Sequence, residues 1–300
     1  MKKLSYILVI LGASLWGIIG IFVNKLYALG LSSMEICFLR VASATLLLSI
    51  YAIFVDRKSF KIHFKDIFLF IVTGILSIIT FNFCYFIAIK ETSLSVAAIL
   101  LYTAPSFVTI FSYFVFKDKI SFKKVFSLLL TFLGCVFVTG YFDSATGAIS
   151  RLGLLAGIGS GIVYSLYSIF GKIALQKYSS LSVTLYSFIF AFIGTLPLIS
   201  LKKTFILISN PTGIIYALCM GLFSTVLAFL FYTRGLENLE PSKASILATV
   251  EPVVATITSV LIFKQSISIF QIIGIILVIA AIFVVSVQKK ENREVDNIRS

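Results

Sequence analysis

The sequence predicts an all-α integral membrane protein with ten transmembrane helices, built as two inverted five-helix repeats. Three observations lead to this fold class: the composition, the spacing of the apolar segments, and an internal repeat. Of the 300 residues, 59% are hydrophobic and only 12% are charged, whereas soluble chains have roughly 45–50% apolar and about 25% charged residues. A soluble domain of this length could not hide so much apolar surface. Ordinary soluble enzymes, disordered chains and small disulfide scaffolds are therefore excluded.

The apolar segments have the length that a helix needs to cross a membrane. A hydrocarbon core of ~30 Å requires about 20 helical residues. The first segment follows Lys2 and Lys3 as a signal peptide would, but its 21 uncharged residues and the lack of a cleavage site favour a retained helix. The alternating hydrophobicity of an outer-membrane barrel is missing from the sequence. In chain order, the ten predicted helices are 4–24, 34–54, 67–89, 93–116, 125–142, 152–171, 181–201, 212–233, 242–263 and 267–287.

The positive charges predict the orientation of these helices. The net charge is +13, but Lys and Arg lie almost wholly between the apolar segments, where they face lipid headgroups rather than nucleic acid. With the N-terminus inside, 18 Lys and Arg residues fall on the inner side and 6 on the outer side. The positive-inside rule then places both termini in the cytoplasm, for a multi-pass protein of the cytoplasmic membrane.

An internal repeat divides the chain. A shift of 147 residues aligns 95–121 with 242–268 and gives 12 identities in 27 positions, among them Pro105 with Pro252. The predicted units are a first repeat at 1–147, a second at 148–288, and a basic cytoplasmic tail at 289–300. Five helices per repeat is an odd number, so the second copy enters the membrane inverted. Inverted repeats are typical of secondary transporters, whose substrate path lies at the repeat interface near the midplane.

Two motifs add a family resemblance. Ala-Ser-Leu-Trp-Gly at 13–17, and the Ser-x-Ala…Pro…Lys-x-x-Ile-Ser pattern that ends the fourth and ninth helices, resemble the drug/metabolite transporter superfamily. The EamA-type family of ten-helix carriers matches over residues 4–287. This resemblance implies transport of small metabolites, often amino acids, through a cavity lined by helices 1, 3, 4, 6, 8 and 9, with helices 5 and 10 peripheral. Relatives often end helices 4 and 9 with an acidic residue, which Asp118 matches loosely and Gln265 does not.

Two charged residues inside predicted helices are candidates for coupling or substrate recognition. Glu251 lies near mid-bilayer, where a carboxylate is expensive. It could couple protons or bind a substrate amine, or it could be a protonated carboxyl bonded to backbone freed by Pro252. Arg40 could bind a substrate carboxylate or pair with Glu251. Alternatively, it snorkels to headgroups or pairs with Glu35.

Other candidates are structural or amphipathic. Pro105 and Pro252 are expected to kink their helices, either as hinges or as static bends. A face of small residues, Gly153, Gly157, Gly161 and Ser165, predicts a close helix–helix contact. Amphipathic side chains in the cavity helices could contact substrate or merely pack; with Glu251, these substrate-binding candidates are Trp16, Asn82, Tyr85, Tyr102, Tyr164, Tyr167 and Tyr232.

Together these features predict a secondary transporter that exports a small molecule across a lipid bilayer by alternating access. Proton antiport through Glu251 and facilitated diffusion both remain open, as do a monomer and a homodimer. No cofactor, metal or nucleic acid is expected: His63 is the single histidine, and the four cysteines have no ligand spacing. The alternatives are a channel-like pore and an intramembrane lipid-modifying enzyme, which would need clustered acids or histidines near an interface.

Overall fold

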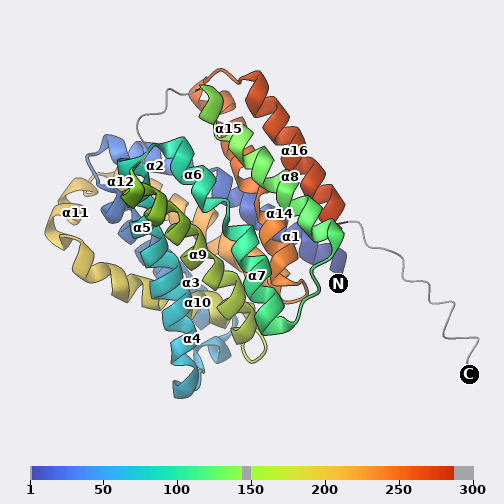
Figure 1. Ribbon diagram of the computed structural model, residues 1–300. Helices are drawn as coiled ribbons and strands as arrows, with labels where there is room; N and C mark the ends of the chain where they lie inside the picture. The colour runs from blue at the N-terminus through green and yellow to red at the C-terminus, as the bar shows by residue number, and fades with distance from the viewer. Residues whose placement is uncertain (1, 144–149, 287–300) are drawn as a thin grey trace, which may run out of the picture.

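The computed structural model describes residues 2–143 and 150–286, and within these ranges the chain is helical without any strand (Figure 1). The first, third, fourth, eighth and ninth passes are divided into consecutive helical elements, whereas the second, fifth, sixth and tenth each run as one helix. The η elements are short 3₁₀ turns, except for η3 and η6, which are π-helical. The elements are α1 (Lys2–Gly17), α2 (Ile19–Ala28), α3 (Ser33–Val55), η1 (Arg57–Phe60), η2 (Phe64–Asp66), α4 (Ile67–Ile71), η3 (Val72–Thr80), α5 (Phe81–Glu91), α6 (Leu94–Leu101), α7 (Ala104–Phe116), α8 (Phe122–Val138), η4 (Tyr141–Asp143), α9 (Arg151–Ala174), α10 (Ser180–Thr195), η5 (Leu196–Leu198), α11 (Leu201–Leu207), α12 (Pro211–Gly221), η6 (Leu222–Leu227), α13 (Ala228–Leu236), α14 (Pro241–Ala248), α15 (Val250–Phe263) and α16 (Ile269–Ser286).

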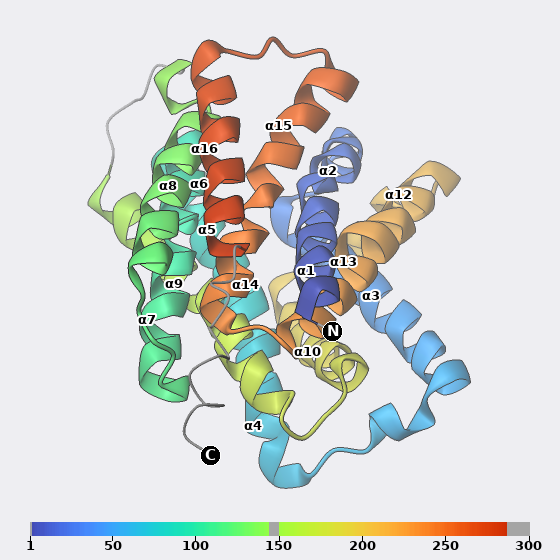
Figure 2. The same ribbon diagram turned by 90° about the vertical axis from the view of Figure 1, so that its right-hand side faces the viewer.

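The described residues contain nine helical segments of at least 18 residues that are apolar enough to cross a membrane. The tenth pass is α8, which has 17 residues and packs along α16 (Figure 2). The predicted fold class is therefore confirmed, but the bounds of the fifth helix were wrong. It begins three residues before the predicted 125, because the Ser121 side chain caps it by accepting a hydrogen bond from the Lys124 amide. It ends near Gly140, whose φ of 70° favours glycine.

Equivalent positions of the two halves have the same local structure. Helices α7 and α15 both end in a left-handed residue, Lys117 with φ 59° and Lys264 with φ 57°. In both cases the next amide donates to a serine carbonyl one turn back, Ser112 or Ser259. The two π-helical segments also correspond under the 147-residue shift, because 222–227 falls on 75–80. The division of the chain at residue 147 remains a prediction, and the tail at 289–300 lies outside the described residues.

Each π-helical region contacts the other half of the chain through a glycine. A Cβ on Gly74 would overlap the backbone of α10 at Ser187, and a Cβ on Gly221 would overlap Ser43 of α3. These two glycines are also equivalent under the repeat. The close approach explains why the smallest residue stands at both positions. It packs the third pass against α10, which is the seventh pass, and the eighth pass against α3, which is the second.

The fourth and ninth passes show what the two prolines do. The chain turns at Tyr102–Thr103, between α6 and α7, and again at Thr249, between α14 and α15. Pro105 and Pro252 lie in the first turn of the following helix, where the missing amide costs little. The prediction of a kink inside a continuous helix was therefore too simple: each pass is interrupted just before its proline.

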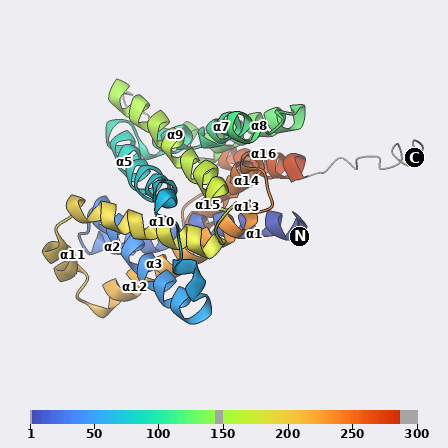
Figure 3. The same cartoon turned by 90° about the horizontal axis from the view of Figure 1, so that it is seen from below.

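Two outer helices, α8 and α16, pack against each other. Gly134 of α8 and Gly274 of α16 lie against each other's helix, so this pair packs tightly. Seen from below, α7, α8 and α16 lie along one side of the bundle and α2, α3 and α12 along the opposite side (Figure 3). The small-residue face of α9 makes the predicted close contact, with Gly157 against Leu100 and Gly161 against Thr103.

Candidate functional site

A central cavity of about 290 Å³ lies among the helices of both repeats. This volume is near the lower end of small-molecule sites, which run from roughly 300 to 1,000 Å³. No residue of α8 or α16 is among its lining residues within the described chain. The lining includes Pro105, Arg40 and every predicted binding residue, namely Trp16, Asn82, Tyr85, Tyr102, Tyr164, Tyr167, Tyr232 and Glu251, whereas Pro252 is buried outside it.

Arg40 and Glu251 are the charged side chains of this lining. Arg40 belongs to α3 in the first half of the chain, and Glu251 to α15 in the second. Within the described residues, the ion pairs do not include one between Arg40 and Glu251. The Arg40 Nε is buried and has no hydrogen-bond partner. The cavity thus holds one guanidinium and one carboxyl group that are not paired with each other.

The alternative partner of Arg40, Glu35, is occupied elsewhere. Its Oε2 accepts hydrogen bonds from the Ser32 amide at 2.7 Å and the Ser32 hydroxyl at 2.8 Å, which forms a capping box at the start of α3. Its Oε1 lies 3.4 Å from the Lys203 Nζ. The Arg40–Glu35 pair considered from the sequence is therefore wrong, because the helix cap and Lys203 hold this carboxylate.

Glu251 lies in the first turn of α15, directly after the interruption at Thr249. The partial positive charge at a helix N-terminus favours a carboxylate at this position. Its backbone carbonyl packs onto Gly17 of α1, where a Cβ would come within 2.7 Å. The Pro252 carbonyl accepts a hydrogen bond from the Thr256 hydroxyl at 2.9 Å, as the Pro105 carbonyl does from Thr109 at 2.8 Å. The same proline–threonine hydrogen bond therefore occurs at the equivalent place in both halves of the chain.

Aromatic rings form much of the wall. Trp16 packs edge-on against Phe229 at 5.0 Å and tilts against Tyr232 at 5.1 Å between ring centroids. Its indole Nε1 is buried and has no hydrogen-bond partner. On the other side, Tyr85 and Tyr164 pack on Phe81 at 5.7 and 5.3 Å. A buried donor without a partner costs free energy, so the indole NH is available for a ligand acceptor.

The two ends of the cavity differ. One end lies beside Tyr27 and Ser33, where the Tyr27 side chain is 44% exposed and its hydroxyl lies 2.7 Å from the Ser33 hydroxyl. At the other end the Tyr232 hydroxyl lies 2.7 Å from that of Ser168, and the Tyr167 hydroxyl lies 2.9 Å from that of Thr233. These four side chains are buried. The cavity is therefore reached from the α2–α3 end and closed at the opposite end.

Some lining residues were missed by the sequence reasoning. Ser33 and Cys37 lie seven and three residues before Arg40, on the same face of α3, so helical periodicity alone could have identified them. Phe81 could not be identified in this way, because it is one of 30 phenylalanines.

The Asn82 amide donates to the Ile78 carbonyl at 2.7 Å, which uses part of its hydrogen-bonding capacity inside the wall. Within 2–143 and 150–286, no three His, Cys, Asp or Glu side chains form a metal-binding group.

Known proteins share this architecture. A solved crystal structure superposes on this one with a TM-score of 0.79 and 16% sequence identity. The superposition covers 95% of this chain and 97% of the other, which shows the same fold. The uncharacterized transporter YetK of Bacillus subtilis is 29% identical over 84% of this chain and 77% of its own. An uncharacterized transporter of Archaeoglobus fulgidus is 27% identical over 95% of this chain and 99% of its own.

The strongest comparison covers both halves of the chain separately. The model of the EamA-like transporter family matches residues 3–140 and again residues 151–287. The two matches together include all ten passes and both charged residues of the cavity. The protein is a multi-pass membrane protein that belongs to the EamA-like transporter family.

Proposed function

We propose that the protein is a secondary carrier that exports a small zwitterionic metabolite, such as an amino acid, by alternating access. The observation that carries this proposal is that Arg40 and Glu251 line one cavity with no ion pair between them. A guanidinium matches a carboxylate by two parallel hydrogen bonds, and a carboxylate accepts hydrogen bonds from an ammonium. A ligand that carries both groups would satisfy both residues at once.

The proposed orientation has both termini in the cytoplasm, as the distribution of Lys and Arg favours. The end of the cavity near Tyr27 then faces outward, and the hydrogen-bonded end near Tyr167 faces the cytoplasm. The structure would accordingly represent the outward-open state. A pore would need both ends open at the same time, so the closed inner end favours a carrier over a channel.

Charged contacts between distant parts of the chain support the inner closure. The Lys124 Nζ at the start of α8 lies 2.5 Å from a carboxylate oxygen of Glu240, just before α14, and Lys243 lies 3.0 Å from the other oxygen. Burial alone would raise the pKa of Glu240, but its hydrogen bonds from Lys124 and Lys243 outweigh this and lower the pKa below its usual value. We infer that the inward-open state requires this link between α8 and α14 to separate.

Lys172 strengthens the same closure. Its Nζ donates to the carbonyls of Leu236 at 2.8 Å and Glu237 at 2.9 Å, which are orphan acceptors at the end of α13. The ammonium therefore ties the end of α9 to the end of α13. Both ties belong to the end of the bundle where the cavity is closed, so opening that end must break or rearrange them.

The function can be tested by counterflow in proteoliposomes preloaded with a mixed amino-acid pool, with and without a pH gradient. Saturable, accelerated exchange of at least one amino acid would support the carrier and its substrate class. Exchange limited to ligands that lack either an amine or a carboxylate would contradict the zwitterion assignment. Flux that rises linearly with concentration would contradict the carrier and favour a pore.

Proton coupling through Glu251 is the second part of the proposal, in competition with facilitated diffusion. The change Glu251→Gln keeps the shape and removes the titrating group. We expect pH-driven accumulation to disappear, while counterflow at equal pH continues with a weaker apparent affinity for the amino acid, because an amide replaces the carboxylate that faces its ammonium. The matched control is Glu237→Gln, because the Glu237 side chain lies outside the cavity lining and pairs with Arg234 at 2.7 Å. Equal pH-driven flux in the Glu251→Gln variant and the unmodified protein would contradict coupling through Glu251, and no pH-driven accumulation in the unmodified protein would leave facilitated diffusion as the mechanism.

A further inference from the structure

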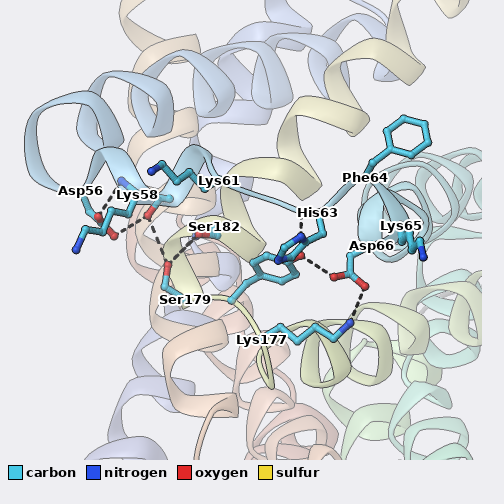
Figure 4. Close-up of a pocket in the computed structure, with 12 residues that line it drawn as sticks. Asp56, Lys58, Lys61, His63, Phe64, Lys65, Asp66, Lys177, Ser179 and Ser182 are labelled. Carbon is cyan, nitrogen blue, oxygen red and sulfur yellow. Dashed lines mark hydrogen bonds and ion pairs between the residues drawn. The ribbon is translucent and has the colours of Figure 1, made fainter.

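A second hollow, of about 930 Å³, lies at the membrane surface away from the central cavity. Residues 56–66, between α3 and α4, form one wall, and residues 177–182, around the start of α10, form the other (Figure 4). The two walls come from different repeats. In the proposed orientation this surface faces the cytoplasm, and the inference below depends on that orientation but not on the transported substrate.

Hydrogen bonds hold the two walls together. The Tyr178 hydroxyl donates to Asp66 Oδ2 at 2.6 Å and accepts from the His63 amide at 3.0 Å. The Lys177 Nζ lies 2.8 Å from Asp66 Oδ1, and this hydrogen bond raises the pKa of Lys177, which remains an ammonium. These interactions appear as dashed lines in Figure 4. The hollow is thus a preformed feature rather than a gap between independent loops.

Both acidic groups of the hollow already have partners. Asp66 is held by Tyr178 and Lys177. Asp56 accepts from the Ser59 hydroxyl at 2.8 Å and from the Lys58 amide at 3.1 Å. Neither carboxylate is therefore available to neutralise a further lysine without losing these bonds.

Three lysine side chains in the lining have no such partner. The ion pairs among the described residues do not include the ammonium groups of Lys58, Lys61 or Lys65. Figure 4 shows Lys58 and Lys61 on one side of the hollow and Lys65 on the other. In Figure 4 the ammonium groups of Lys58 and Lys65 lie at opposite edges of the hollow, so its rim carries positive charge while its acids are already paired, and this favours an anion there.

Two aromatic side chains place this hollow at the lipid boundary. Phe64 is 87% exposed and Phe68 is 60% exposed, and Phe64 begins the third membrane span. Phe64 points away from the lysines in Figure 4. Apolar rings exposed next to lysines are favourable where the rings enter the bilayer and the ammonium groups remain at headgroup level. A dissolved ion would explain the lysines but not the exposed rings.

We propose that this hollow binds the phosphate headgroup of an anionic phospholipid from the cytoplasmic leaflet. The flexible side chains of Lys58, Lys61 and Lys65 would turn inward from the rim to the phosphoryl oxygens, while Phe64 and Phe68 would lie along the acyl chains. Basic pockets between transmembrane helices on the cytoplasmic side bind such headgroups. Because the walls belong to different repeats, the bound lipid would join the α3–α4 loop to the start of α10. Free phosphate offers the same phosphoryl chemistry, so the test must separate the two sources.

The test measures lipid retention by native mass spectrometry and thermal unfolding of the full chain in detergent. Phosphatidylglycerol, phosphatidylcholine and inorganic phosphate are added separately. We expect phosphatidylglycerol to be retained and to raise Tm, phosphatidylcholine to do neither, and inorganic phosphate to raise Tm little. The variant with Lys58, Lys61 and Lys65 all changed to Gln should bind phosphatidylglycerol on the order of a hundredfold more weakly, at roughly fivefold for each lysine.

A matched variant removes three lysines from another loop on the same side: Lys117, Lys119 and Lys123, each changed to Gln. It should retain phosphatidylglycerol like the unmodified protein. Equal losses in the two triple variants would overturn the site, because only general charge would then matter. Stabilisation by inorganic phosphate but not by phosphatidylglycerol would overturn the lipid assignment. If the pocket variant is unfolded without lipid, the single change Lys61→Gln, expected to weaken retention roughly fivefold, supplies the same comparison.

Discussion

Replacing Arg40 with Gln tests whether the cavity recognises a carboxylate. Arg40 lies in the cavity wall, its Nε is buried without a hydrogen-bond partner, and Glu35 is held by Ser32 and Lys203. Binding a carboxylate therefore breaks no existing ion pair of Arg40. A hydrogen bond to a charged group contributes about 1.5–3 kcal/mol. The variant should thus bind an amino acid roughly tenfold to a hundredfold more weakly.

The assay compares two competitors of counterflow: the amino acid that exchanges best, and the amine that lacks its carboxylate. We expect Arg40→Gln to weaken inhibition by the amino acid and to leave inhibition by the amine nearly unchanged. Lys203→Gln is the matched control, because Lys203 is 60% exposed and pairs with Glu35 outside the cavity. The reasoning would be refuted by an equal loss for both competitors, or by an equal effect of the control.

Three further predictions concern the inner closure and the packing of the repeats. Glu240→Gln should weaken the Lys124 contact and shift the carrier toward the inward-open state. The measurement is faster modification of a cysteine placed at Ser245, in the cavity lining, by a thiol reagent supplied from inside. Glu237→Gln should not have this effect, and unchanged labelling in Glu240→Gln would contradict the closure. The pKa of folded Glu240 is lowered from 4.5, so its link stabilises the closure above that pH and is lost as the pH falls through the folded value. Labelling, corrected for the smaller thiolate fraction in acid by reference to an exposed cysteine, should therefore rise in acid. A flat corrected profile below pH 4.5 in the unmodified protein would argue against this. Gly74→Val should destabilise the fold by about 1–3 kcal/mol through overlap with Ser187. Gly159→Ala, with no atom within 4 Å of the added Cβ, should be neutral or slightly stabilising in thermal unfolding. Equal losses of stability in the two variants would contradict the packing argument.

The number of passes could be predicted from the sequence because membrane spans leave a strong apolar pattern. The details inside those passes could not. The π-helical turns at Val72–Thr80 and Leu222–Leu227 lie in apolar residues whose composition suits an α-helix equally well. Tight packing at Gly74 and Gly221 accompanies both turns, and such contacts between distant segments leave little signal in the local sequence. The break at Thr249 likewise occurs three residues before Pro252, the only local marker of it.

The candidate site was easier to identify for its charged members than for its aromatic ones. Glu251 and Arg40 stood out because ions are rare inside membrane spans. The tyrosines were chosen by helix position, and the structure shows that they make different contacts. Tyr167 and Tyr232 are hydrogen-bonded at the closed end, while Tyr85 and Tyr164 pack on Phe81. Only the packed structure separates these two groups.

The repeat itself argues that Arg40 and Glu251 serve a purpose other than folding. Under the 147-residue shift, Arg40 corresponds to Ser187 and Glu251 to Ala104. Ser187 is completely buried, and its hydroxyl lies 2.7 Å from that of Thr73 at the contact between α10 and the π-helical turn. The second copy thus completes the same packing with a small neutral residue, and the first copy has a neutral Ala104 in the cavity wall. Since neither half requires a charge at these positions to fold, the two charges are best explained by the ligand that the cavity holds.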